Sequence, residues 1–60
     1  GLSDREAGIA MMIADGFTNR QIASALKLSD GTARNYISAI YLKLGVENRL
    51  AAIAKVKEIV

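Results

Sequence analysis

The sequence predicts an all-α domain of four helices, because its composition favours helices and a helix-start pattern recurs along it. Ala, Ile, Leu and Val supply most of the 52% hydrophobic content, proline is absent and aromatic residues make up only 5%. This balance favours helices over strands. Polar residues that cap helices recur along the chain, each followed by apolar residues at helical spacing. A chain of 60 residues forms one small domain, which buries only about 60% of its unfolded surface.

The first predicted helix spans residues 3–15. Ser3 is suited to be its N-cap, and Glu6 completes a capping box in which the hydroxyl and the carboxylate each accept a hydrogen bond from a free backbone amide. Gly16 follows the helix and can adopt the left-handed conformation that closes it. The apolar face of this helix is formed by Ile9, Met12 and Ile13.

Two further helices are predicted over residues 18–26 and 29–44. Thr18 and Ser29 are their N-caps, eleven positions apart. Gly45 is expected to end the longer helix. The apolar positions of both helices face one shared core, and they are Ile22, Ala23, Leu26, Ala33, Ile37, Ile40 and Leu44. Two such helices joined by a tight turn form a helix-turn-helix.

Asn48 is the predicted cap of a fourth helix over residues 48–59. The inward-facing positions of this helix are Ile53, Val56 and Val60. The residues expected to form the single core of the domain are Leu2, Ile9, Ile13, Ile22, Leu26, Leu28, Ile37, Ile40, Leu44 and Ile53.

The helix over residues 29–44 keeps one face free of the core. At helical spacing this face carries Gly31, Arg34, Asn35, Ser38 and Leu42. Its small residues let the helix backbone approach a partner closely. Arg and Asn are the side chains that bind guanine and adenine bidentately in a major groove. The pattern therefore predicts a module that binds double-stranded DNA.

The distribution of charge agrees with a nucleic-acid partner. Residues 16–44, which contain the predicted helix-turn-helix, carry four of the eight basic side chains and a single carboxylate. Positive charge therefore gathers on the unit predicted to contact DNA, although scattered basic residues also commonly serve only to solvate a helix surface.

Other classes of function find little support in the sequence. His and Cys are absent, and no Ser has an identifiable base partner, so we expect no enzyme activity, no metal site and no cofactor. No apolar run reaches the ~18 residues needed to span a bilayer, and the last helix has only two lysines to face anionic lipid. We therefore expect a cytoplasmic location without membrane binding.

Four segments in order carry a family resemblance, and they are LSDRE at 2–6, ADGFTNRQIASAL at 14–26, LSDGTARNYIS at 28–38 and KLGVENR at 43–49. Together they resemble the LuxR/FixJ-type helix-turn-helix output domain over nearly the whole chain. Such domains have four helices and bind DNA, commonly as the C-terminal part of a two-component response regulator or a quorum-sensing activator. The resemblance implies that residues 1–60 are the C-terminal fragment of a longer transcriptional regulator, with RNA polymerase as a further partner.

The resemblance also implies which residues contact DNA. The helix over residues 29–44 lies in the major groove, with Arg34 and Asn35 reading bases, while Asn19 and Arg20 lie beside a phosphate strand. The full set of expected DNA-binding residues is Asn19, Arg20, Ser29, Gly31, Thr32, Arg34, Asn35, Ser38 and Lys43.

The fourth helix is the dimer contact that the resemblance implies. On this helix Leu50, Ala54 and Lys57 share a partly apolar strip beside the core-facing positions. In a homodimer, Leu50 and Ala54 meet their own copies, and Lys57 approaches Glu58 of the other chain.

One alternative remains open, a trihelical protein-interaction or dimerisation module with weak or no DNA binding. An exposed Leu42 and the apolar side of the last helix favour it slightly. The salt dependence of the affinity for duplex DNA separates the two functions, because phosphate contacts release counterions.

Overall fold

A computed structural model describes residues 1–59 and contains four helices. They are α1 (Asp4–Ala14), α2 (Asn19–Leu26), α3 (Asp30–Leu44) and α4 (Arg49–Ile59). No strand occurs between residues 1 and 59. All four predicted helices are confirmed, and each observed boundary lies within one residue of the predicted one.

The helix starts depend on the predicted caps. The Ser3 hydroxyl accepts a hydrogen bond from the Glu6 amide at 3.2 Å, and the Glu6 carboxylate accepts one from the Ser3 amide at 2.9 Å. Thr18 and Gln21 form the same capping box at the start of α2. The other two caps are Ser29, which accepts from the Thr32 amide at 3.1 Å, and Asn48, which accepts from the Ala51 amide at 2.8 Å. Each cap satisfies an amide that has no partner within its own helix.

Three helix ends share one hydrogen-bond motif, in which a residue with a positive φ and the residue after it donate their amides back to the last turn. Gly16 ends α1 and Gly45 ends α3 in this way, with φ angles of 90° and 72°. Lys27 takes the equivalent place after α2 with a φ of 57°, although it carries a side chain. The sequence does not indicate this third turn, because the usual glycine is absent.

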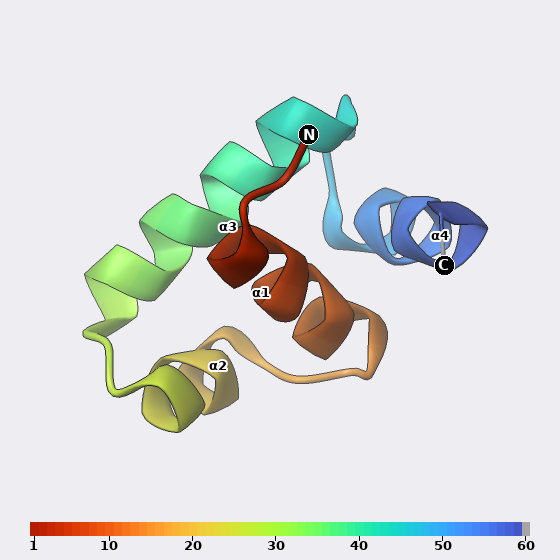
Figure 1. Ribbon diagram of the computed structural model, residues 1–60. Helices are drawn as coiled ribbons and strands as arrows, with labels where there is room; N and C mark the ends of the chain where they lie inside the picture. Colours follow the sequence, from red (N-terminus) through yellow and green to blue (C-terminus); the bar gives the residue numbers. More distant parts are fainter. Residues whose placement is uncertain (60) are drawn as a thin grey trace.

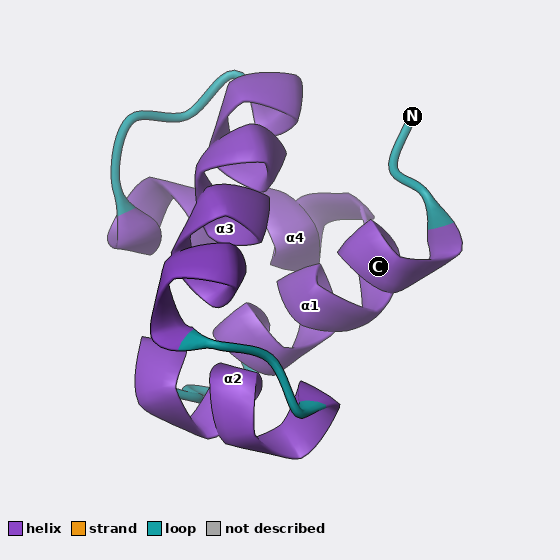
Figure 2. Cartoon of the chain, turned by 90° about the vertical axis from the view of Figure 1, so that its left-hand side faces the viewer, coloured by secondary structure: helices purple, strands orange, loops and turns teal. Residues whose placement is uncertain are grey.

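The helices pack around α1 (Figures 1 and 2). α1 contacts both α3 and α4, and α2 packs against α3. In Figure 1, α1 lies between α2 on one side and α4 on the other, with the long helix α3 running across them. In this arrangement α3 contacts the other helices through one side, and its other side is exposed.

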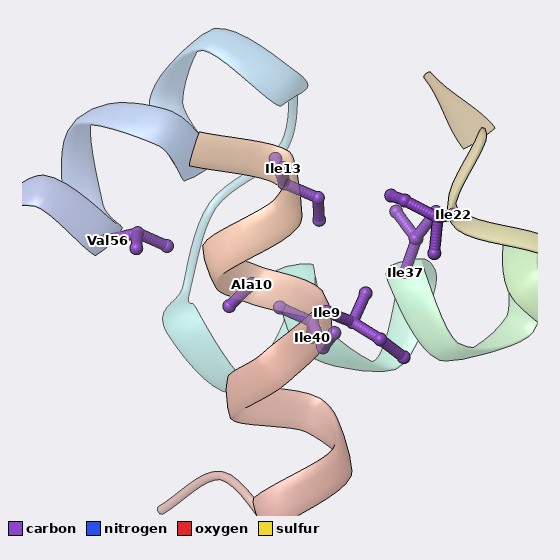
Figure 3. Close-up of a cluster of buried hydrophobic side chains, with 7 residues drawn as sticks. All are labelled: Ile9, Ala10, Ile13, Ile22, Ile37, Ile40 and Val56. Atoms are coloured by element: carbon purple, nitrogen blue, oxygen red, sulfur yellow. The ribbon is translucent and has the colours of Figure 1, made fainter. Parts of the chain in front are cut away.

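The core is a cluster of isoleucines that also includes Ala10 and Val56 (Figure 3). The predicted core residues Ile9, Ile13, Ile22, Ile37 and Ile40 are buried, as is Val56. The alanines that join them in the interior are Ala10, Ala23, Ala33 and Ala52. Small side chains there let neighbouring helix backbones come close.

Half of the predicted core is less buried than expected. Four of its residues pack around the rim of the cluster and are half-buried: Leu2, Leu26, Leu44 and Ile53. Leu28 is half-buried in the turn after α2. The inner face of α4 is centred on Ala52 and Val56 rather than on Ile53. The prediction for Val60 falls outside the described residues.

Replacing Lys27 with glycine should stabilise the domain. A non-glycine residue in the left-handed region costs about 1–2 kcal/mol, part of which the greater freedom of unfolded glycine offsets. We expect Lys27→Gly to raise the free energy of unfolding by about 1 kcal/mol, and with it the Tm by about 4–8 °C. Lys27→Ala removes the same charge without relieving the backbone, so thermal melting should show no gain for it. Equal Tm values for the two variants would contradict this account.

Candidate nucleic-acid interface

The exposed side of α3 lies opposite the face that enters the core. Successive residues of a helix are turned by about 100°, so the buried Ala33, Ile37 and Ile40 leave a free stripe on the far side. The predicted stripe is exposed along its whole length, and it consists of Gly31, Arg34, Asn35, Ser38 and Leu42. Leu42 is 83% exposed. Side chains on this stripe are therefore free to meet a partner without disturbing the core.

Ser29 and Thr32 meet each other at the start of α3. The Ser29 hydroxyl donates to the Thr32 hydroxyl oxygen at 2.9 Å, and it also accepts from the Thr32 amide. Ser29 is thereby engaged in capping. The Thr32 hydroxyl keeps its own proton available as a donor on the exposed surface.

Lys43 lies at the other end of α3 and pairs with α1. Its ammonium donates to the Glu6 carboxylate at 2.8 Å. Glu6 is only 7% exposed, whereas the Lys43 side chain is 47% exposed. The Lys43 ammonium, and after it the Ser3 backbone amide, hold the pKa of Glu6 below its ordinary value. Lys43 thus stabilises a buried carboxylate as well as carrying charge beside α3.

Asn19 and Arg20 are both exposed at the start of α2. The Asn19 side chain is also held from α4, because Nη1 of Arg49 donates to its Oδ1 at 3.1 Å. The other terminal nitrogen of Arg49, Nη2, is buried and has no hydrogen-bond partner among residues 1–59. The starts of α2 and α4 are therefore joined by a polar contact.

Two cations near this surface were not singled out from the sequence. Arg5 of α1 lies over the ring of Tyr36 of α3, with its guanidinium carbon 5.8 Å from the ring centroid. Arg49 is the other, through its contact with Asn19. Both contacts join residues far apart in the chain, so no local pattern identifies them.

A second exposed surface lies on α4. Leu50 is 79% exposed, and Ala54, Lys57 and Glu58 beside it are exposed too. This strip faces away from the buried Ala52 and Val56. The residues predicted for a dimer contact therefore share one accessible side of α4.

Between Gly1 and Ile59, no three side chains of the metal-ligating types gather closely enough to hold an ion. None of the helices α1–α4 combines the length and the apolar character that crossing a membrane requires.

The fold and the free face of α3 define a helix-turn-helix DNA-binding domain. The sequence profile described as "Bacterial regulatory proteins, luxR family" matches residues 1–56. The chain belongs to this family, and it is a DNA-binding output domain of that type. The family consists of DNA-binding regulators rather than enzymes.

Named relatives agree with this assignment. The chain is 47% identical over 57 residues to "Transcriptional regulatory protein DesR" of Bacillus subtilis (strain 168), covering 95% of this chain and 29% of that protein. It is 40% identical over 52 residues to "DNA-binding transcriptional activator DevR/DosR" of Mycobacterium tuberculosis, covering 87% of this chain and 24% of that protein.

A solved structure of a response regulator has the same fold. It is titled "Crystal Structure of Response Regulator ChrA in Heme-Sensing Two Component System", and it superposes with a TM-score of 0.90 at 41% identity. The match covers 97% of this chain and 29% of that one. The chain thus spans less than a third of the length of these relatives.

The ion pair between Glu6 and Lys43 should make stability depend on pH in a defined direction. The pKa of Glu6 is lowered by folding, so its contribution is complete above the ordinary pKa of about 4.3. That contribution is lost as the pH falls through the lowered value. Glu6→Gln keeps an oxygen for the Ser3 amide but removes the charge.

We therefore expect Glu6→Gln to melt below the unmodified chain at neutral pH. The gap in Tm should close as the pH falls below about 4. Thermal melting of both proteins across this pH range measures the gap in Tm. Asp15→Asn is the control, because it removes an exposed carboxylate. A gap that persists unchanged into acid would assign the loss to packing rather than to charge.

Proposed function

We propose that this domain binds double-stranded DNA sequence-specifically, with α3 in the major groove. The observation that carries the proposal is the pair Arg34 and Asn35, both exposed on the free stripe of α3. Bidentate contacts from Arg to guanine and from Asn to adenine require this freedom. Gly31 and Ser38 on the same stripe leave little bulk between the helix backbone and the bases.

Contacts to the DNA backbone are proposed for both ends of the helix-turn-helix. At the start of α2, Asn19 and Arg20 stand beside backbone amides that have no partner within the helix. Thr32 supplies a hydroxyl donor near the start of α3. Such contacts fix the register of the protein on the duplex, while the base-reading side chains discriminate between sequences.

Lys43 has two roles in this proposal. Its ammonium neutralises Glu6 in the free domain, yet the side chain remains half exposed. An ammonium has three donors, so Lys43 can bind Glu6 and a DNA phosphate at the same time. The nearby carboxylate should reduce the phosphate contribution of Lys43 below that of an unpaired lysine.

A homodimer through α4 is proposed as the form that occupies an operator. A Leu50 side chain at 79% exposure is the largest apolar group of the strip, and two copies of it would be removed from water in a dimer. The patch is small, so the isolated domain should pair weakly in solution and more firmly on two adjacent half-sites.

The chain is proposed to be the C-terminal part of a longer cytoplasmic response regulator. The named relatives and the superposed structure are all about three to four times longer than the matched region. A regulatory domain and a contact with RNA polymerase are expected of the whole protein, as the family suggests.

The base-reading role of α3 is tested with Arg34→Ala and Asn35→Ala. Each variant should lose about 1–3 kcal/mol of binding free energy on an operator selected from random duplexes, and little on mixed-sequence DNA. Both side chains are exposed, so the Tm should stay nearly unchanged. Fluorescence anisotropy titrations on the two kinds of duplex measure the difference.

Lys43→Ala is the contrasting variant in the same titrations. It should weaken binding on all sequences and reduce the slope of log affinity against log salt by up to about one. If Arg34→Ala left operator binding unchanged, Arg34 would be a solvent-exposed charge with no part in base recognition. A weak, salt-insensitive affinity of the unmodified domain for every duplex would favour the protein-interaction function instead.

The dimer is tested with Leu50→Glu, which places two like charges in the proposed contact. The variant should fold and bind a single half-site with little change. On an operator with two half-sites about ten base pairs apart, it should lose cooperative occupancy. Ile59→Glu is a matched control, because Ile59 is a 65% exposed apolar residue elsewhere on α4. If Leu50→Glu kept full cooperativity, the contact would lie on another surface.

A further inference from the structure

Arg49 makes a contact that neither its own helix nor the core requires. It is the first residue of α4, yet its guanidinium reaches the first residue of α2, thirty positions earlier in the chain, at 3.1 Å. The remaining terminal nitrogen is buried without a partner, which costs desolvation free energy. The bond to Asn19 therefore links the start of α4 to the start of α2 rather than to a group of α4 itself.

The contact fixes which way the Asn19 amide faces. A guanidinium has only donors, so the atom of Asn19 that meets it is the carbonyl oxygen Oδ1. The amide nitrogen Nδ2 must then point the other way, as a donor. Because Asn19 is exposed, this donor is open to solvent at the start of α2, whose first amides have no partner within the helix.

The charges at the four helix starts distinguish α2 and α4 from the other two helices. α1 and α3 begin with carboxylates, which stabilise the positive end of the helix dipole. α2 and α4 have no carboxylate in their first turns, and they carry Arg20 and Arg49 there instead. A cation at that end opposes the dipole, so these two helix starts gain stability when an anion is present.

We infer that Arg49 is a positioning residue for the DNA backbone, and that it acts through Asn19. It holds Asn19 so that Nδ2 and the first amides of α2 converge on one phosphate group. The inference rests on the proposed DNA-binding function, and it deepens that function by giving α4 a part in phosphate recognition.

The first experiment compares Arg49→Met with Lys55→Met in the unmodified domain. Both variants remove one positive charge from α4, and Lys55 is exposed. Titrations of a mixed-sequence duplex should show a loss of about fivefold to tenfold for Arg49→Met and less than about twofold for Lys55→Met. Arg49→Lys keeps the charge but not the planar fork, so it should lose nearly as much as Arg49→Met. Full affinity in Arg49→Lys would overturn the positioning role, because charge alone would then suffice.

The second experiment asks whether Arg49 acts through Asn19. In a domain that already carries Asn19→Ala, Arg49→Met should cause little further loss of affinity. Losses that simply add in the double variant would overturn the inference, since Arg49 would then act independently.

Asn19→Asp separates positioning from folding. A carboxylate there pairs with Arg49 and favours the dipole of α2, so the Tm should rise. The same carboxylate repels a phosphate, so the affinity for mixed-sequence DNA should fall by more than about tenfold. A raised Tm with undiminished affinity would show that no phosphate lies at Asn19. Asn19→Asp also tests the inference if Arg49→Met folds poorly.

Failure of this inference can be told apart from failure of the proposed function. If the unmodified domain lacks salt-dependent DNA binding, the proposed function itself fails. If it binds DNA and loses operator affinity through Arg34→Ala, while the Arg49 and Asn19 variants match the unmodified domain, only the role of Arg49 is wrong.

Discussion

Burial of the isoleucine face of α1 against α3 is the contact on which the other features depend. α2 has eight residues, and isolated helices shorter than about 12–15 residues are marginal in water. Ile9 and Ile13 supply the apolar surface that meets Ile22 of α2 and Ile37 of α3 in one cluster. The geometry of the exposed stripe on α3 is therefore set by residues on its opposite side. Loss of that cluster would remove the apolar contact that α2 and α3 share with α1.

Electrostatics adds a second constraint that joins both ends of the fold. Glu6 takes part in the cap of α1 and also pairs with Lys43, near the end of α3. A buried carboxylate is costly unless it is paired and hydrogen-bonded, and here the Lys43 ammonium and the Ser3 amide both donate to it. The end of α3 is thus tied to the beginning of α1. The charge of Lys43 serves the fold first, and it contributes to DNA binding only through the part that remains exposed.

Most of the fold could be predicted because its signals are local. Ser3 with Glu6, and Thr18 with Gln21, are spaced as capping boxes, and the isoleucines recur at helical intervals. The features that were missed are of two kinds. Ala10 and Ala52 are buried where α1 and α4 pack together, which the small side chain of alanine does not reveal from the sequence. The contacts from Glu6 to Lys43 and from Arg49 to Asn19 join residues 37 and 30 positions apart, and only the packed helices bring them together.

The division of α3 into two sides has a consequence for how such a domain can change over time. Arg34, Asn35 and Ser38 contribute nothing to the buried cluster, and substitutions at sites that share no partners usually have independent effects on stability. New combinations at these positions can therefore arise without compensating changes in the interior. Thr32 and Lys43 do not have this freedom, because each has a partner within the domain. Divergence of binding preference should accordingly concentrate on the middle of the helix, while its two ends stay constrained by the scaffold.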